Sequence, residues 1–210
     1  DYIDSMMPDH ELETKTLKEG LGEDIEIEVY AYSDEKREEF YEHLKDADAL
    51  LTAFTKIDKE AMEHAPKLKV IAINATGYDN VDMEEATKRN IGVCPVGEYC
   101  TWDVSEAAIA YMFALNKNFK FYQHQIEVEH KWDYAAGPEL PRIEDQTLGI
   151  IGFGKIGKCT ARKAKGIVGR IIANDPFIDK SLFAENGVEE ADVDTLLAEA
   201  DIIINHMNLN

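Results

Sequence analysis

The chain has 210 residues, enough for one large domain or two small ones. Hydrophobic residues make up 45% of it, which predicts a packed core and excludes an intrinsically disordered protein. Because 42 acidic residues outnumber 22 lysines and arginines, the formal net charge of −20 disfavours nucleic acids and anionic membranes as partners.

The acidic residues are spread along the chain, which indicates a solvated acidic surface, with adaptation to a saline cell interior as the alternative. The three cysteines, Cys94, Cys100 and Cys159, form no C-x-x-C pair, so we expect free thiols in a reducing cytoplasm. No stretch is apolar for long enough to span a bilayer, and no signal peptide is recognisable. The first residue is Asp1, so we expect the natural start to lie upstream.

The first half alternates strand-like and helix-like segments. The end of a first strand is expected at residues 2–3, and residues 25–30 alternate apolar and acidic side chains, the pattern of a half-buried strand. Further short strands are predicted at 49–51, 70–73 and 91–93, with helices at 10–19, after Ser33, at 58–64 and, capped by Asp82, at 83–89. Five strands with four intervening helices predict a parallel, flavodoxin-like domain that ends near residue 97.

A helix is predicted from about residue 102 to residue 130, and its middle, residues 107–115, is almost wholly apolar. A helix that is apolar on all sides must be buried between domains or between subunits. We therefore predict a homodimer through the helix at about 102–118, with an ordinary core helix as the alternative.

A second strand–helix series begins at Thr147. Strands are predicted at 148–151, 170–173 and 202–204, with a weak one near Val188. Helices are predicted at 155–165, from Ser181 to Gly187, and at 195–199 with Asp194 as the cap.

The stretch from Gly152 to Gly157 reads G-F-G-K-I-G, directly after a buried strand and at the start of a helix. A lone G-x-G-x-x-G is a weak signal, but this context is the one that dinucleotide binding requires. Gly152 permits a tight turn, Gly154 lets the backbone approach a pyrophosphate, and Gly157 lets the helix pack close to the strand. The helix amino terminus then attracts the pyrophosphate.

Asp175 follows the second strand of this series, about 20 residues beyond the glycines, where the fingerprint places an acid. A carboxylate there accepts hydrogen bonds from ribose hydroxyls and repels a 2′-phosphate, which favours NAD over NADP. The alternative is that Asp175 only starts a turn before Pro176.

Four stretches together resemble the D-isomer-specific 2-hydroxyacid dehydrogenase family: residues 74–82, 91–93, 101–106 and 148–176. The resemblance covers the whole chain and implies a substrate domain over 1–97 followed by an NAD-binding Rossmann domain over 98–210. It implies that Ala75, Thr76 and Gly77 present backbone N–H groups to the substrate carboxylate. For the cofactor it implies contacts from Thr101, Val104, Gly152, Phe153, Gly154, Lys155, Ile156, Gly157, Asp175, Pro176 and His206.

The family's catalytic Arg, Glu and His lie beyond its fourth Rossmann strand, and no residue of this chain matches them. His206 matches instead the family's H-x-P beside the cofactor, although the sequence here is His206-Met207-Asn208, without the proline. His124 and His130 lie six residues apart and so do not share a helix face, and no metal site is predicted. We expect the natural protein to continue beyond Asn210, so that the apolar strand 202–204 is not left as an exposed edge.

The leading hypothesis is an NAD-dependent oxidoreductase that acts on the CH–OH group of a small D-2-hydroxy acid, or reduces the 2-oxo acid with NADH. The alternative is a catalytically inactive NAD(H)-binding dimerisation module or an NAD-sensing regulator.

Overall fold

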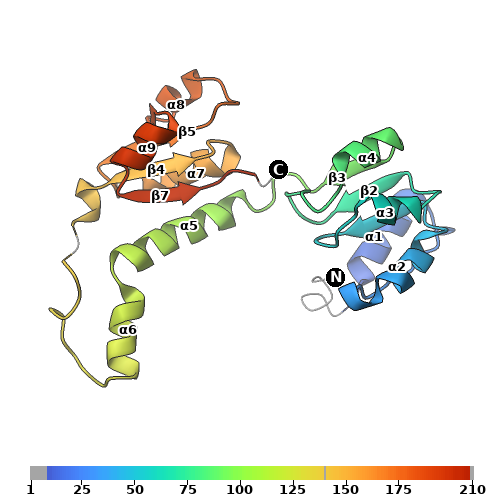
Figure 1. Cartoon of the computed structure of the whole chain (residues 1–210), viewed down its shortest axis with the longest axis horizontal. Helices are drawn as coiled ribbons and strands as arrows, with labels where there is room; N and C mark the ends of the chain where they lie inside the picture. Colours follow the sequence, from blue (N-terminus) through green and yellow to red (C-terminus); the bar gives the residue numbers. More distant parts are fainter. Residues whose placement is uncertain (1–8, 140, 209–210) are drawn as a thin grey trace. The chain divides into compact units, whose positions relative to one another are not determined.

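The structure, a computed structural model, describes residues 9–139 and 141–208, and it divides into two compact units (Figure 1). In the described residues the first unit ends at Glu98 and the second begins at Tyr99. Each unit has a parallel sheet and a hydrophobic core of its own.

The first unit contains a three-stranded parallel sheet in the order β1-β2-β3. Its central strand is the most buried: the side chains of Ile71 and Ile73 pack against Ile57 and Met62 in the core. Asp58 and Asp82 begin two of the helices, since each carboxylate accepts a hydrogen bond from a backbone N–H three residues on. The elements are α1 (Glu11–Leu21), η2 (Asp34–Lys36), α2 (Arg37–Leu44), β1 (Ala49–Thr52), α3 (Lys59–Glu63), β2 (Val70–Ile73), α4 (Met83–Lys88) and β3 (Gly92–Pro95).

The strand predicted at 25–30 is wrong, because this segment has no regular structure. Burial follows its alternation only in part, since Ile25 and Ile27 are half-buried whereas Val29 is exposed. Tyr30 and Tyr32 pack against the core, and the Tyr32 ring lies edge-on to Phe40 at 5.1 Å. Alternation is typical of a strand, but a strand also needs a hydrogen-bonded neighbour. The first predicted strand, at 2–3, lies outside the described residues.

The second unit contains a four-stranded parallel sheet in the order β6-β5-β4-β7. In chain order this is 3-2-1-4, the start of the Rossmann arrangement. The predicted α/β class with two parallel sheets is thus confirmed. The elements around this sheet are η3 (Ile143–Asp145), β4 (Thr147–Ile151), α7 (Lys155–Ala164), β5 (Arg170–Asn174), α8 (Ser181–Glu185), β6 (Glu189–Glu190), α9 (Val193–Glu199) and β7 (Ile202–Asn205).

The central strands β4 and β5 form the core of the second unit. Leu148, Ile150 and Ile172 are completely buried, as is Leu196 of α9. The cap of α9 is Asp192 rather than the predicted Asp194, because its carboxylate accepts the Thr195 N–H at 2.7 Å.

The helix predicted over 102–130 is two helices, α5 (Thr101–Asn116) and α6 (Phe119–Glu127). The break lies at Asn118, whose φ of 51° is left-handed, a conformation that asparagine tolerates and that ends a helix. In Figure 1, α5 runs beside the second sheet and α6 turns away from it. α5 has 16 residues, and within the described ranges no helix is both long and apolar enough to cross a bilayer.

Candidate functional site

The candidate site lies at the carboxyl edge of the second sheet, where β4, β5 and β7 end together. Ile151 pairs with Asn174 on one side and with Asn205 on the other. The chain beyond each strand stays tied to this edge, because the Gly152 N–H donates to the Asn174 carbonyl and the His206 N–H to the Ile151 carbonyl. Ligand sites of parallel α/β sheets form at this edge.

The glycine loop between β4 and α7 has the geometry that its sequence predicts. Gly152 has φ of +88°, and a Cβ atom there would lie 2.7 Å from the backbone carbon of His206. A Cβ at Gly157 would lie 2.2 Å from the Gly152 carbonyl oxygen. Both positions therefore admit only glycine, because the neighbouring atoms belong to the backbone and cannot move aside.

Gly154 differs from these two glycines, since a Cβ added to it would meet no atom within 4 Å. It is the exposed N-cap of α7, and no side chain among the described residues caps that helix. Lys155 and Ile156 form the start of the first turn, with Lys155 exposed and Ile156 half-buried. The arrangement leaves space over a helix amino terminus, which suits a phosphate group.

Phe153 points the other way, into the core, where it is fully buried and stacks on Phe183 at a centroid distance of 5.0 Å. Its backbone N–H donates to Asp175 Oδ2 at 2.8 Å. The loop is therefore anchored both by a buried ring and by a hydrogen bond to the acid at the end of β5.

Asp175 is half-buried and accepts a second hydrogen bond on Oδ1, from the Phe177 N–H at 3.0 Å. That contact is the turn expected by the alternative interpretation, and Pro176 lies exposed within it. A carboxylate has about four acceptor positions, so two remain for hydroxyl donors.

His206 follows β7 and lies against the glycine loop. Its Nε2 atom and the Thr160 hydroxyl of α7 share a hydrogen bond of 2.9 Å. Burial lowers the pKa of the His206 imidazole, which favours the neutral ring. Thr160, which is fully buried, was missed from the sequence because 46 residues separate it from its partner.

Thr101 and Val104 lie in the first turn of α5, and only Thr101 is buried. α5 packs on α7, with Ser105 Oγ 3.2 Å from Cys159 Sγ. All the predicted cofactor residues therefore belong to the second unit.

Ala75, Thr76 and Gly77 belong to the first unit, in the loop after β2. Ala75 is buried and accepts the Val96 N–H, whereas Thr76 and Gly77 are exposed. The Asn80 side chain joins this loop to the one after β1 by donating to the Ala53 and Thr55 carbonyls at 3.2 and 2.8 Å. Asn80 lies within residues 74–82, but nothing in the sequence indicates this bridging role.

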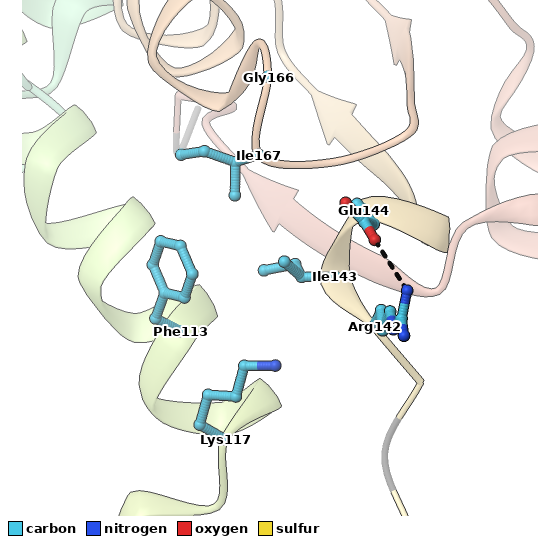
Figure 2. A pocket seen from close by; sticks show the side chains of 7 residues that line it. All are labelled: Phe113, Lys117, Arg142, Ile143, Glu144, Gly166 and Ile167. Atoms are coloured by element: carbon cyan, nitrogen blue, oxygen red, sulfur yellow. Dashed lines mark hydrogen bonds and ion pairs between the residues drawn. The ribbon is translucent and has the colours of Figure 1, made fainter.

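A hollow of about 400 Å³ lies at the opposite edge of the second sheet (Figure 2). Figure 2 shows Phe113 of α5 and Lys117, which follows the end of this helix, facing Ile143 and Ile167, which precede β4 and β5. Because these residues precede the strands, the hollow is at the amino edge and is separate from the candidate site. Its lining consists of Phe113, Lys117, Arg142, Ile143, Glu144, Gly166 and Ile167.

Comparisons with known proteins agree with this geometry. Residues 4–190 match the family model described as D-isomer specific 2-hydroxyacid dehydrogenase, catalytic domain. A glyoxylate reductase of Korarchaeum cryptofilum (strain OPF8) is 38% identical over 172 residues, which cover 80% of this chain and 52% of that protein. The chain spans about half the length of the curated relatives it matches.

Solved structures show the same likeness. The NAD-dependent formate dehydrogenase of Staphylococcus aureus, in complex with NAD, has a TM-score of 0.76 and 29% identity, covering 95% of this chain and 58% of that one. The D-lactate dehydrogenase of Aquifex aeolicus, complexed with NAD and lactic acid, has a TM-score of 0.82 over 95% of this chain and 59% of that one. Its 24% identity supports the shared fold alone. The chain therefore belongs to the D-isomer specific 2-hydroxyacid dehydrogenase family.

Proposed function

We propose that this chain provides the NAD site and the substrate-carboxylate site of an NAD-dependent D-2-hydroxyacid dehydrogenase that reduces a small 2-oxo acid. The observation that carries the proposal is the glycine loop, which opens onto the amino terminus of α7 and is hydrogen-bonded to Asp175. We assign residues 98–210 to the NAD domain and 1–97 to the substrate domain.

The residues at the amino terminus of α7 and at the end of β5 have cofactor roles that follow from their positions. Gly154 and the first turn of α7, with Lys155 and Ile156, hold the pyrophosphate. The two remaining acceptor positions of Asp175 bind ribose hydroxyls, and its negative charge disfavours the 2′-phosphate of NADP. The bound cofactor supplies the hydride that this class of enzyme transfers to C2 of a 2-oxo acid.

His206 is proposed to line the cofactor site as a neutral hydrogen-bonding group. Its hydrogen bond to Thr160 fixes the ring, and its backbone lies against Gly152. We assign no catalytic role to it, and the catalytic Arg, Glu and His of the family have no counterpart proposed within this chain.

The substrate site is proposed at Ala75, Thr76 and Gly77, where exposed backbone follows a buried strand. Backbone N–H groups in such a loop bind a carboxylate without the desolvation of a buried cation. Glyoxylate is our first choice of 2-oxo acid, because relatives named glyoxylate reductase are 32% to 38% identical to this chain.

A homodimer is proposed through the helix at about 102–118, most of which is α5. In the single chain Tyr111 is 69% exposed and Leu115 77%. Apolar side chains four residues apart on one helix indicate a face that a second copy covers. The three free cysteines support a reducing compartment, and we propose the cytoplasm.

Fluorescence titration of the chain with NADH and with NADPH tests the cofactor assignment. We expect saturable NADH binding and NADPH binding at least about tenfold weaker, because the 2′-phosphate meets Asp175. Absence of NADH binding, or tighter NADPH binding, would refute the proposal. Turnover of glyoxylate with NADH is then assayed in the natural full-length protein, where NADH binding without turnover would favour the NAD(H)-binding module.

A further inference from the structure

The first turn of α5 is held to α7 by a lysine that reaches a backbone oxygen. Lys163 Nζ donates to the Trp102 carbonyl at 3.0 Å and lies 2.8 Å from Glu106 Oε1. The Lys163 side chain is only 20% exposed, whereas that of Glu106 is 66% exposed. The surface ion pair alone therefore does not account for the burial of this lysine, because exposed pairs contribute little.

Two further contacts converge on the same turn. Ser105 is fully buried, and its Oγ atom lies 2.8 Å from the Trp102 carbonyl oxygen and 3.2 Å from Cys159 Sγ. The Arg162 guanidinium lies over the Trp102 ring at 4.6 Å. Three residues of α7 thus hold the turn that carries Thr101 and Val104, the two residues that the family resemblance implies lie near the nicotinamide.

α7 also begins at the glycine loop, so one helix carries the pyrophosphate cradle and fixes the first turn of α5. We propose that Lys163 is a positioning residue, which sets the first turn of α5 against the nicotinamide half of the cofactor. The inference rests on the proposed NAD site. Lys163 acts through the Trp102 carbonyl and does not itself touch the cofactor.

The test compares NADH with ADP-ribose, which lacks the nicotinamide, by calorimetric titration of the full chain. Lys163→Met is expected to raise the Kd for NADH roughly fivefold, since one charged hydrogen bond to the turn is lost. The Kd for ADP-ribose is expected to change by less than about twofold, because its contacts at the glycine loop and at Asp175 are unaltered.

The control is Lys165→Met, which removes the same charge at the end of α7 and should leave both affinities unchanged. Ser105→Ala removes a different contact to the same turn and should shift the ratio of the two affinities in the same direction. It also keeps the test decisive if Lys163→Met fails to fold.

Three results would overturn the inference. The first is an NADH affinity that neither variant changes, and the second is an equal loss of NADH and ADP-ribose affinity, which a merely structural role would give. The third is a wild-type chain that binds both ligands equally, since no nicotinamide contact would then exist to be positioned. If the wild-type chain binds neither ligand, the NAD proposal itself fails, and the inference fails with it.

Discussion

Gly154 and Gly157 lie three residues apart in one loop, yet alanine should have opposite consequences at the two positions. At Gly157 the new Cβ would lie 2.2 Å from the Gly152 carbonyl oxygen, about 1 Å short of an ordinary carbon–oxygen contact. Both groups are backbone, so relief requires α7 to move away from β4. Overpacking of this kind lowers the free energy of unfolding by about 1–3 kcal/mol.

At Gly154 nothing lies within 4 Å of the added Cβ, and the extended backbone there has a φ of −69° that alanine adopts. Gly154→Ala should therefore change the free energy of unfolding by less than about 1 kcal/mol, the scale of a helix cap. NADH binding should nevertheless fall at least about tenfold, because the methyl group occupies the space proposed for the pyrophosphate.

Thermal unfolding and NADH titration of both variants separate the two effects. For Gly157→Ala a loss of about 2 kcal/mol corresponds to a Tm lower by about 4–8 °C. If Gly154→Ala bound NADH as the wild type does, the open space above this glycine would not be the cofactor cradle. If Gly157→Ala kept the wild-type Tm, the close approach of α7 to the loop would be wrong.

Three other changes test the acid, the histidine and the dimer face. Asp175→Asn should lower NADH affinity by about tenfold and reduce the ratio of NADH affinity to NADPH affinity, because the charge that repels the 2′-phosphate is lost. Parallel titrations with the two cofactors measure this ratio, and an unchanged ratio would contradict the prediction. Since burial lowers the pKa of His206 from the ordinary 6.5, the unfolded state binds more protons at acidic pH. The free energy of unfolding should thus fall as the pH drops below 6.5, and His206→Gln should weaken this pH dependence. Denaturant titrations at several pH values measure it, and the same change in free energy with pH in both proteins would contradict the prediction. Leu115→Glu should give monomers by light scattering, whereas the wild-type dimer should tighten with salt, which screens the charge of −20 on each copy.

The elements that can be predicted best from the sequence are those determined by residues close together in the chain. Strand β4, the glycine loop and α7 follow from an apolar run, a fixed glycine spacing and the helix that must follow it. Asp82 was predicted correctly as a cap, because it directly precedes the helix and no other aspartate lies within two residues of it. Before α9 the sequence offers two aspartates two residues apart, Asp192 and Asp194, and local sequence alone does not choose between them.

The errors have nonlocal or conformational causes. Residues 25–30 alternate as a strand does, but pairing is decided by the neighbouring backbone. The helix predicted over 102–130 ends early because Asn118 is left-handed, and the apolar side chains around it gave no sign of a break. The site shows the same division: the glycines could be located from spacing, whereas the contact between His206 and Thr160 depends on how β7 and α7 pack.

The two interpretations of Asp175 are compatible, and together they explain why an aspartate suits this position. The turn interpretation accounts for the hydrogen bond from Phe177, and the loop anchor accounts for the one from Phe153. These two N–H groups orient the carboxylate and leave its remaining lone pairs for other donors. A longer glutamate would shift the carboxylate away from both N–H groups, and an asparagine would offer a single acceptor oxygen. The hydrogen bonds that form the turn therefore also preorganise the acid that we propose binds the ribose.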